Sequence, residues 1–190
     1  MRQRPPRRAE GGSGRRGVRR RSPGRPGPRR NGRAAAGLLS RSGNTWVLAG
    51  ALARRYDADL FELRPRDPWP EDYEQMVTWA HEWRDSDGDV PLAETLSGID
   101  SYRTVFLGFP IWGNELPAVA RSFLRSHDLS GKTVVPFITY GSSGPGNSME
   151  TVRALAPNAR VLDPFVLQCD QERSTLDSLE GWLGSVGEPL

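Results

Sequence analysis

The chain has 190 residues and a net charge of +3, and that charge is divided unevenly. Residues 1–33 contain 13 of the 26 basic side chains and one of the 23 acidic ones, Glu10, so this segment carries about +12 and the remainder −9. An acidic body argues against nucleic acid as its partner and favours docking to a basic protein surface. One cysteine, Cys169, excludes an intramolecular disulfide framework and a cysteine-based metal site, and no apolar run approaches the ~20 residues of a membrane-spanning helix.

Residues 1–33 consist almost wholly of Arg, Gly, Pro and Ser. Such a segment cannot bury enough apolar surface to offset its ordering entropy, so we predict a disordered tail followed by one domain over residues 34–190. Three interpretations of the tail stay open: binding of nucleic acid or anionic lipid through charge, an export signal in which Arg29 and Arg30 precede an apolar stretch, and an incidental extension. We favour the incidental extension and expect a cytoplasmic protein.

The first strand is expected over Ala34–Leu39, although alanine and glycine have low β-propensity. An apolar-periodic helix is expected from about Thr45 to Tyr56, capped by Asn44 or Ser42. The hydroxyl-rich turn between them consists of Ser40, Arg41, Ser42, Gly43, Asn44 and Thr45. The turn leaves backbone N–H groups free at a helix N-terminus, where the macrodipole favours an anion. It lacks the Gly-Lys-Ser/Thr ending of a nucleoside-triphosphate loop, so we predict a phosphate cradle of amides and hydroxyls, with an ordinary capped turn as the alternative.

Four further strand–helix units follow along the chain. The strands are expected over residues 59–63, 104–109, 133–139 and 161–167, the last interrupted by Pro164. The helices are expected from near Pro70 to just before Asp85, and over residues 117–126, 148–155 and 172–183. Alternation of this kind is typical of an α/β fold, a parallel sheet with helices on both faces, in which ligands bind beyond the carboxyl ends of the strands.

Two later strands end in unusual loops. Residues 110–115 begin with Pro110, Ile111, Trp112 and Gly113. Residues 139–147 begin with Thr139, Tyr140, Gly141, Ser142, Ser143 and Gly144. If both loops converge with residues 40–45, Trp112 and Tyr140 offer flat surfaces beside a phosphate site. A phosphorylated planar heterocycle fits that set.

The three loops together resemble those of the flavodoxins, in particular short bacterial flavodoxin-like proteins. The matching motifs are Ser-Arg-Ser-Gly-Asn-Thr at 40–45, Phe-Pro-Ile-Trp-Gly at 109–113 and Thr-Tyr-Gly-Ser-Ser-Gly at 139–144. The resemblance covers roughly residues 38–185. It implies a doubly wound, five-stranded parallel sheet of order 2-1-3-4-5. It also implies bound FMN, with the phosphate at residues 40–45 and the flavin ring between residues 110–113 and 139–144.

This resemblance leads us to expect a flavodoxin-like redox protein that transfers electrons through bound FMN. It would act as an electron carrier or a small FMN-dependent oxidoreductase, serving a redox partner with a basic docking surface or a small-molecule acceptor. One alternative is an NAD(P)H-dependent quinone or nitro-compound reductase. The others are a non-redox module that holds another phosphorylated ligand and a nucleic-acid binder driven by the arginine tail.

Trp112 and Gly113 each allow two interpretations. Trp112 would stack on the flavin ring or serve as a hydrophobic anchor for the next helix. Gly113 would let its peptide turn toward flavin N5 or form a simple turn. His81 is expected at an ordinary surface position and His127 as a cap at a helix end. We expect no catalytic acid or base and no metal site.

Overall fold

The computed structural model describes residues 33–169, 179 and 181–186. The predicted tail therefore lies outside the described residues, except for Arg33. The strands are β1 Arg33–Leu38, β2 Asp59–Glu62, β3 Tyr102–Pro110, β4 Thr133–Tyr140, β5 Arg160–Val161 and β6 Phe165–Gln168. The helices are α1 Asn44–Tyr56, α2 Tyr73–Asp85, a 3-10 turn at Ile99–Ser101, α3 Ala118–Ser126 and α4 Ser148–Leu155. Of the predicted last helix, residues 172–183, the structure describes 179 and 181–183; these are helical, as are residues 184–186.

The strands form one parallel sheet in the order β2-β1-β3-β4-β5, which confirms the predicted order 2-1-3-4-5. The broken last strand is also confirmed, because it is divided into β5 and β6. β5 pairs with the start of β4 and β6 pairs with its end. Pro164, which lacks an N–H to donate to a ladder, lies between the two pieces.

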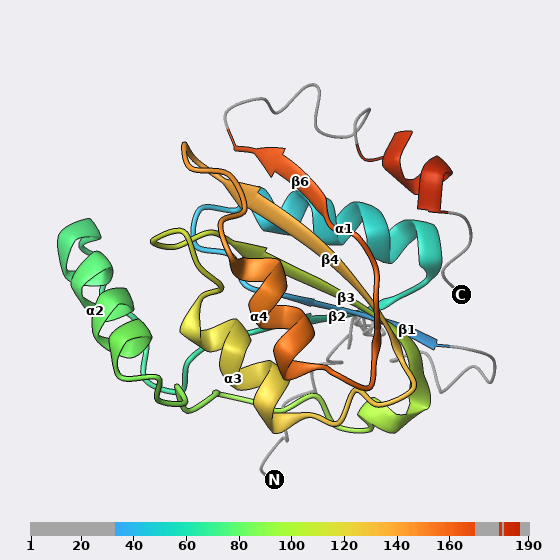
Figure 1. Ribbon diagram of the computed structural model, residues 1–190, viewed down its shortest axis with the longest axis horizontal. Helices are drawn as coiled ribbons and strands as arrows, with labels where there is room; N and C mark the ends of the chain where they lie inside the picture. Colours follow the sequence, from blue (N-terminus) through green and yellow to red (C-terminus); the bar gives the residue numbers. More distant parts are fainter. Residues whose placement is uncertain (1–32, 170–178, 180, 187–190) are drawn as a thin grey trace, which may run out of the picture.

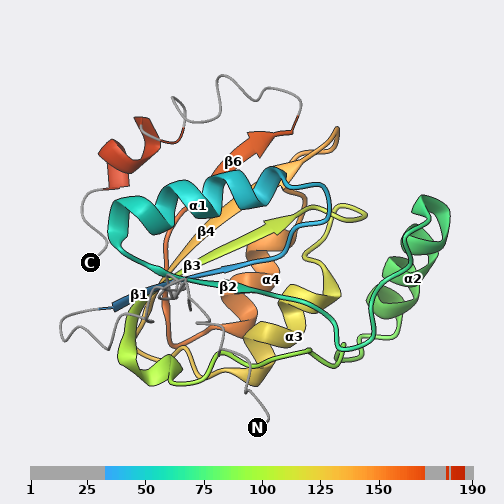
Figure 2. The same ribbon diagram turned by 180° about the vertical axis from the view of Figure 1, so that it is seen from behind.

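Helices cover both faces of the sheet, as predicted (Figures 1 and 2). Helix α1 and the C-terminal helical residues lie on one face, where Leu48, Leu52 and Leu183 share a buried cluster with the sheet. Helices α3 and α4 lie on the other face, with Phe123 and Val152 in a second cluster. In contrast, α2 stands apart, beside the carboxyl ends of the strands (Figure 1).

The expected start of α2 near Pro70 is wrong by three residues, because α2 begins at Tyr73. Asp72 has an extended backbone, and its side chain accepts a hydrogen bond from the N–H of Gln75 at 3.0 Å. An aspartate in this position satisfies one of the free donors of the first turn, so it fixes the start of the helix.

The alanine-rich strand β1 lies in the interior of the sheet, between β2 and β3. Ala34, Ala35 and Ala36 are at most 2% exposed. Low intrinsic β-propensity is overridden here because bulky neighbours fill the volume that alanine leaves. The cluster on this face includes the rings of Phe106 from the adjoining strand β3 and of Phe137 from β4.

Strand β1 begins at Arg33, one residue before the predicted start, so Arg33 belongs to the sheet and not to the tail. Its guanidinium forms an ion pair with Asp59 and lies 5.3 Å from the ring centroid of Tyr102. The Tyr102 hydroxyl donates to the same carboxylate at 2.9 Å. Burial, followed by this carboxylate, raises the pKa of Tyr102. These contacts join β1, β2 and β3 at their amino ends.

Candidate functional site

The three predicted loops lie together at the carboxyl ends of β1, β3 and β4, which are neighbours in the sheet. The chain leaving β1 is tied to β3 by the N–H of Leu39, which donates to the carbonyl of Gly108 at 2.8 Å. The chain leaving β3 is tied to β4 by the N–H of Ile111, which donates to the carbonyl of Thr139 at 2.9 Å. The buried hydroxyls of Thr45 and Thr139 lie 3.0 Å apart. The topology therefore brings the three sequence motifs to one place.

The turn at residues 40–45 is closed by Ser40, whose hydroxyl accepts a hydrogen bond from the N–H of Gly43 at 3.1 Å. The predicted helix cap is wrong, because neither Asn44 nor Ser42 caps α1. The N-cap is Gly43, with a φ of 94° and no side chain to offer, while Asn44 donates to the Ser42 hydroxyl at 3.4 Å. The first turn also carries no acidic residue. Its N–H groups thus have neither an intrahelical acceptor nor a side-chain cap, which makes them available to an anion.

The hydroxyls of this turn differ in exposure. Ser40 and Thr45 are buried, at 7% and 1% exposure, and their side chains are engaged with Gly43 and Thr139. Ser42 is exposed. The main chain and the Ser42 hydroxyl are therefore the groups that this turn presents to a ligand.

The loop after β3 contains a tight reversal at residues 112–115. Trp112 and Glu115 exchange two backbone hydrogen bonds, of 3.4 and 3.3 Å. The two residues between them, Gly113 and Asn114, have φ values of 62° and 66°. Two consecutive residues with positive φ are typical of a type I′ turn, which both glycine and asparagine accommodate.

The loop after β4 is locked onto this reversal through the main chain. The N–H of Asn147 donates to the carbonyl of Asn114 at 3.2 Å. A Cβ added at Gly146 would overlap that same carbonyl group, whereas a Cβ at Gly144 would have open space around it. Gly146 is therefore a positioning residue that the sequence prediction missed, although the repeated glycines of Gly144-Pro145-Gly146 were a usable signal.

The remaining predicted residues of this loop lie at or near the surface. Tyr140 and Gly144 are half-buried, and Gly141, Ser142 and Ser143 are exposed. Gln168 of β6 donates to the carbonyl of Gly141 at 2.9 Å. The loop therefore forms an accessible rim beside the reversal at residues 112–115.

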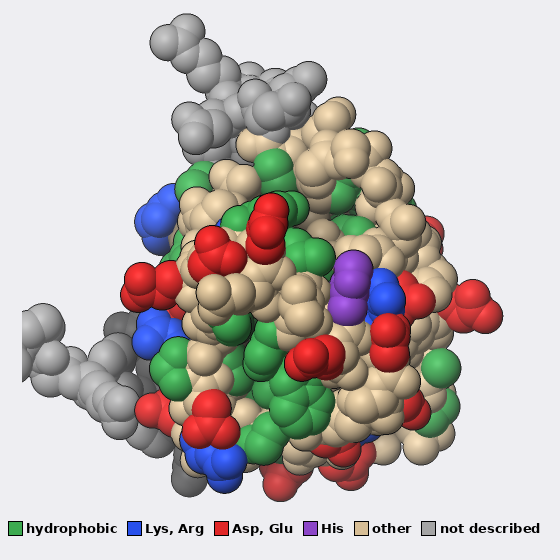
Figure 3. All heavy atoms as spheres, turned by 90° about the vertical axis from the view of Figure 1, so that its left-hand side faces the viewer, with side chains coloured by type: hydrophobic (Ala, Val, Ile, Leu, Met, Phe, Trp, Pro, Cys, Tyr) green, Lys and Arg blue, Asp and Glu red, His purple; other side chains and the backbone are tan. Residues whose placement is uncertain are grey.

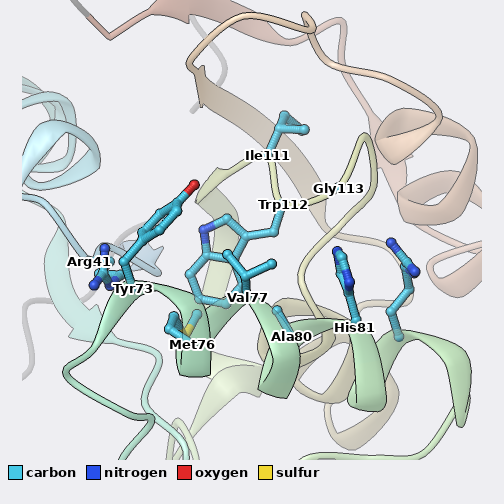
Figure 4. Close-up of a pocket in the computed structure, with 10 residues that line it drawn as sticks. Arg41, Tyr73, Met76, Val77, Ala80, His81, Ile111, Trp112 and Gly113 are labelled. Carbon is cyan, nitrogen blue, oxygen red and sulfur yellow. The ribbon is translucent and has the colours of Figure 1, made fainter.

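The ring of Trp112 is half-buried and packs edge-on against Trp69, with the ring centroids 5.9 Å apart and the planes at 87°. In Figure 4 the ring points toward Met76 and Val77 of α2, and Ile111 points the opposite way. The contacts thus show Trp112 as an apolar anchor between the loop and α2. Stacking of Trp112 on a flavin stays a prediction.

A cavity of about 170 Å³ lies between α2 and the loop after β3 (Figure 4). It is lined by Arg41, Tyr73, Met76, Val77, Ala80, His81, Arg84, Ile111, Trp112 and Gly113. Tyr73, Met76, Val77 and Ala80 follow one another at spacings of three, one and three residues on α2, and together they form the apolar face that this helix directs to the cavity. His81, expected at an ordinary surface position, is exposed and also lines the cavity.

Arg41 joins the turn at residues 40–45 to α2. One of its Nη atoms donates to the carbonyl of Glu71 at 3.1 Å, and its guanidinium lies 5.5 Å from the ring centroid of Tyr73. The side chain that we expected at the phosphate is thus directed toward the start of α2.

The other end of α2 is held by two arginines of α3. Arg121 is nearly buried and donates to the carbonyls of Trp83 and Gly88 at 2.8 and 3.3 Å. Arg125 donates to the carboxylates of Asp87 and Asp89 at 2.9 and 3.0 Å. The hydrogen bond and charge of Arg125 hold the pKa of Asp87 below its usual value.

His127 caps α3, as predicted. Its Nδ1 lies 2.9 Å from the carbonyl of Phe123, and its Nε2 accepts a hydrogen bond from the N–H of Leu96 at 3.0 Å. The ring therefore bridges the end of α3 and the segment that contains Leu96. Among the described residues, no three His, Cys, Asp or Glu side chains lie close enough to one another to hold a metal ion. No helix within the described ranges is long and apolar enough to cross a bilayer.

The family model described as flavodoxin matches residues 34–186. No curated protein matches the chain. A crystal structure assigned to the flavoproteins, from Bacteroides eggerthii, superposes with a TM-score of 0.68 at 27% identity, over 82% of this chain and 98% of that one.

Two more distant structures share the fold. A flavoprotein from Lactobacillus acidophilus, solved in complex with FMN, has a TM-score of 0.60 at 16% identity and covers 77% of this chain and 99% of its own. Oxidised flavodoxin 2 from Bacillus cereus has a TM-score of 0.51 at 18% identity, over 79% and 94% of the two chains.

Proposed function

Because the chain belongs to the flavodoxin family, we propose that it binds FMN and transfers electrons through the bound flavin. The observation that carries this proposal is the convergence of three loops around the uncapped first turn of α1. The contacts with the cofactor would come from residues 40–45, 110–113 and 139–144.

The donors of the first loop fit a phosphate. The free N–H groups of the first turn of α1 have no side-chain cap, so they would donate to the phosphate, and the exposed Ser42 hydroxyl would add a donor. The positive φ of Gly43 and the open space around it let the main chain approach closely. Thr45 and Thr139 would contribute through the main chain, because their hydroxyls pair with each other.

The other two loops would flank the flavin ring. When bound, FMN supplies the redox chemistry, and the protein contributes orientation, hydrogen bonds and local charge. The main chain at Gly113, held in a tight reversal and exposed, is positioned to offer a hydrogen-bonding group to the ring edge. Tyr140 and the exposed residues after it form the opposite rim.

The charge of the body supports a protein partner. Outside residues 1–33 the chain carries −9, so we propose that electrons pass to a protein with a basic docking surface, in the cytoplasm. Association with such a partner should slow as salt is added, because exposed charges are screened over about 10 Å at 0.1 M ionic strength.

The test is a titration of the cofactor-free full chain with FMN and with riboflavin, which lacks the phosphate. Replacing Ser42 with Asp places a negative charge beside the phosphate, so Ser42→Asp should weaken FMN far more than riboflavin. Ser143→Asp is the matched control, since it adds the same charge at another exposed serine and should affect both ligands alike. Equal losses for FMN and riboflavin in Ser42→Asp would show that the turn does not meet the phosphate.

The cavity beside Trp112 favours a second candidate, an NAD(P)H-dependent reductase of quinones or nitro compounds. A reductase needs room for a small substrate, which an electron carrier does not. Consumption of NADH or NADPH by the FMN-loaded protein in the presence of a quinone separates the two functions. A carrier would give turnover only with a protein partner.

A further inference from the structure

The cavity between α2 and the loop after β3 has the size of one aromatic ring. Its volume is about 170 Å³, and an apolar cavity of about 150 Å³ in another protein accommodates benzene. The lining shares Arg41, Ile111, Trp112 and Gly113 with the proposed cofactor site. Among the described residues it includes none from residues 139–147, so this space adjoins the proposed cofactor site on the side of α2.

The walls suit a flat apolar ring. Tyr73 and Trp112 offer two aromatic side chains, and Met76, Val77 and Ala80 of α2 form an apolar floor beneath them (Figure 4). Aromatic rings favour offset or edge-on contact with a further ring. The face of the molecule on the side of α2 shows exposed apolar side chains among charged ones (Figure 3).

Two polar side chains stand at opposite ends of this cavity. Arg41 lies at one end and His81 at the other (Figure 4). The partners of the Arg41 guanidinium within the described part of the chain are a carbonyl and an aromatic ring, so its charge is not neutralised there by a carboxylate.

Arg84 stands at the same end as Gly113. Its Nε donates to Asp85 at 2.8 Å, and a Cβ placed on Gly113 would lie 2.8 Å from its Nη1. The Nη edge of the guanidinium is therefore directed at the loop that walls the cavity, while the Nε edge is occupied. A guanidinium edge matches the two oxygens of a carboxylate.

We propose that this cavity is a binding site for a single-ring aromatic carboxylate, adjoining the proposed cofactor site and sharing with it the wall formed by residues 111–113. The ring lies between Tyr73 and Trp112, and the carboxylate meets the free edge of Arg84. Glycine at position 113 keeps that edge accessible, because any side chain there would displace Arg84. The site therefore depends on α2, which the three loop motifs do not include.

The test is calorimetric titration of the FMN-loaded full chain with 4-hydroxybenzoate and with the neutral 4-hydroxybenzyl alcohol. The acid should bind at least about tenfold more tightly than the alcohol, because it alone meets the guanidinium as an ion. Arg84→Gln should remove this preference and leave the alcohol unaffected. Arg66→Gln is the matched control, since Arg66 also pairs with the aspartate that follows it but does not line the cavity.

A second pair of variants tests the cavity itself. Ala80→Leu fills the space and should abolish binding of both compounds, whereas Thr78→Leu makes a similar change at an exposed position of α2 that does not line the cavity. Affinity for FMN should be unchanged in both.

Three results would overturn the proposal: equal affinity for the acid and the alcohol, acid binding that survives both Arg84→Gln and Ala80→Leu, or displacement of the acid by FMN. The last would place the cavity inside the cofactor site. If the chain fails to bind FMN at all, the same titration on the cofactor-free protein still tests the cavity, so failure of the proposed function is distinguished from failure of this site.

Discussion

Two walls face each other across the cavity, and different forces hold them. The loop wall, residues 110–115 backed by residues 139–147, continues directly from the buried strands β3 and β4 and is joined main chain to main chain at Asn114. The α2 wall, Tyr73–Asp85, buries Met76 alone among its 13 residues, all of which are described. It is held at its ends by Arg41, Arg121 and Arg125. The loop wall is therefore held rigidly by the sheet, whereas the α2 wall is held by a few arginine side chains.

The largest expected effect lies beneath the loop wall. Phe123 of α3 is fully buried in the cluster that supports β3 and β4. Phe123→Ala should lower the free energy of unfolding by about 3–5 kcal/mol, as measured by urea denaturation. Met76→Ala on α2 is the companion variant and should cost about 2 kcal/mol, the low end of the range for a buried methionine, since no other residue of its helix is fully buried. Similar losses for the two variants would contradict the difference between the walls.

The next effect concerns the arginine at the end of α2. Arg121→Ala removes two hydrogen bonds from a charged, nearly buried group and should cost about 2 kcal/mol. Hydrogen exchange should show faster opening at residues 83–89, with β3 and β4 still protected. Arg125→Ala, whose aspartate partners are exposed, should cost less than about 1 kcal/mol. Uniform loss of protection across the sheet would mean that Arg121 supports the core and not the α2 wall.

Substitutions at two glycines test whether the contact between the two loops of the loop wall is needed for FMN binding. Gly144 and Gly146 both have positive φ, so alanine at either position costs about 1–2 kcal/mol from the backbone alone. Only Gly146→Ala also meets the Asn114 carbonyl. It should therefore lose about 1 kcal/mol more than Gly144→Ala and bind FMN about tenfold more weakly. Equal FMN affinities would show that the two loops need not be locked for cofactor binding.

The smallest effect is the pH dependence of the α2 wall. Because Arg125 lowers the pKa of Asp87, the folded form gains stability above the usual carboxyl range and loses it as the pH falls below about 4. Below that pH, limited proteolysis should cleave the chain faster at residues 85–89, while the sheet is still folded. Arg125→Gln should make cleavage at neutral pH resemble that of the parent protein in acid.

The parts of the fold that the sequence predicted are those with a local signal. The continuous apolar runs of β3 and β4 and the three loop motifs each carry their information within a few residues, so their positions followed. The strand order came from the resemblance to the flavodoxins that these loop motifs carry. The parts that it missed depend on distant neighbours. The periodicity of α2 showed an apolar face but not what that face meets. The N-cap position of α1 requires a positive φ, which glycine accommodates, so Gly43 occupies it. Gly146 matters because it lies against the carbonyl of Asn114 in another loop.

The direction of strand β1 also determines the orientation of the protein when it is attached to a solid support through its amino-terminal side. Arg33 stands at the amino end of the sheet, and the six residues of β1 carry the chain about 20 Å to the loops at the other end. A linker to an electrode or a bead, attached through the chain that precedes Arg33, therefore joins the molecule at the end remote from the three loops and the cavity. Immobilised in this orientation, the protein presents its reactive end to the surrounding solution.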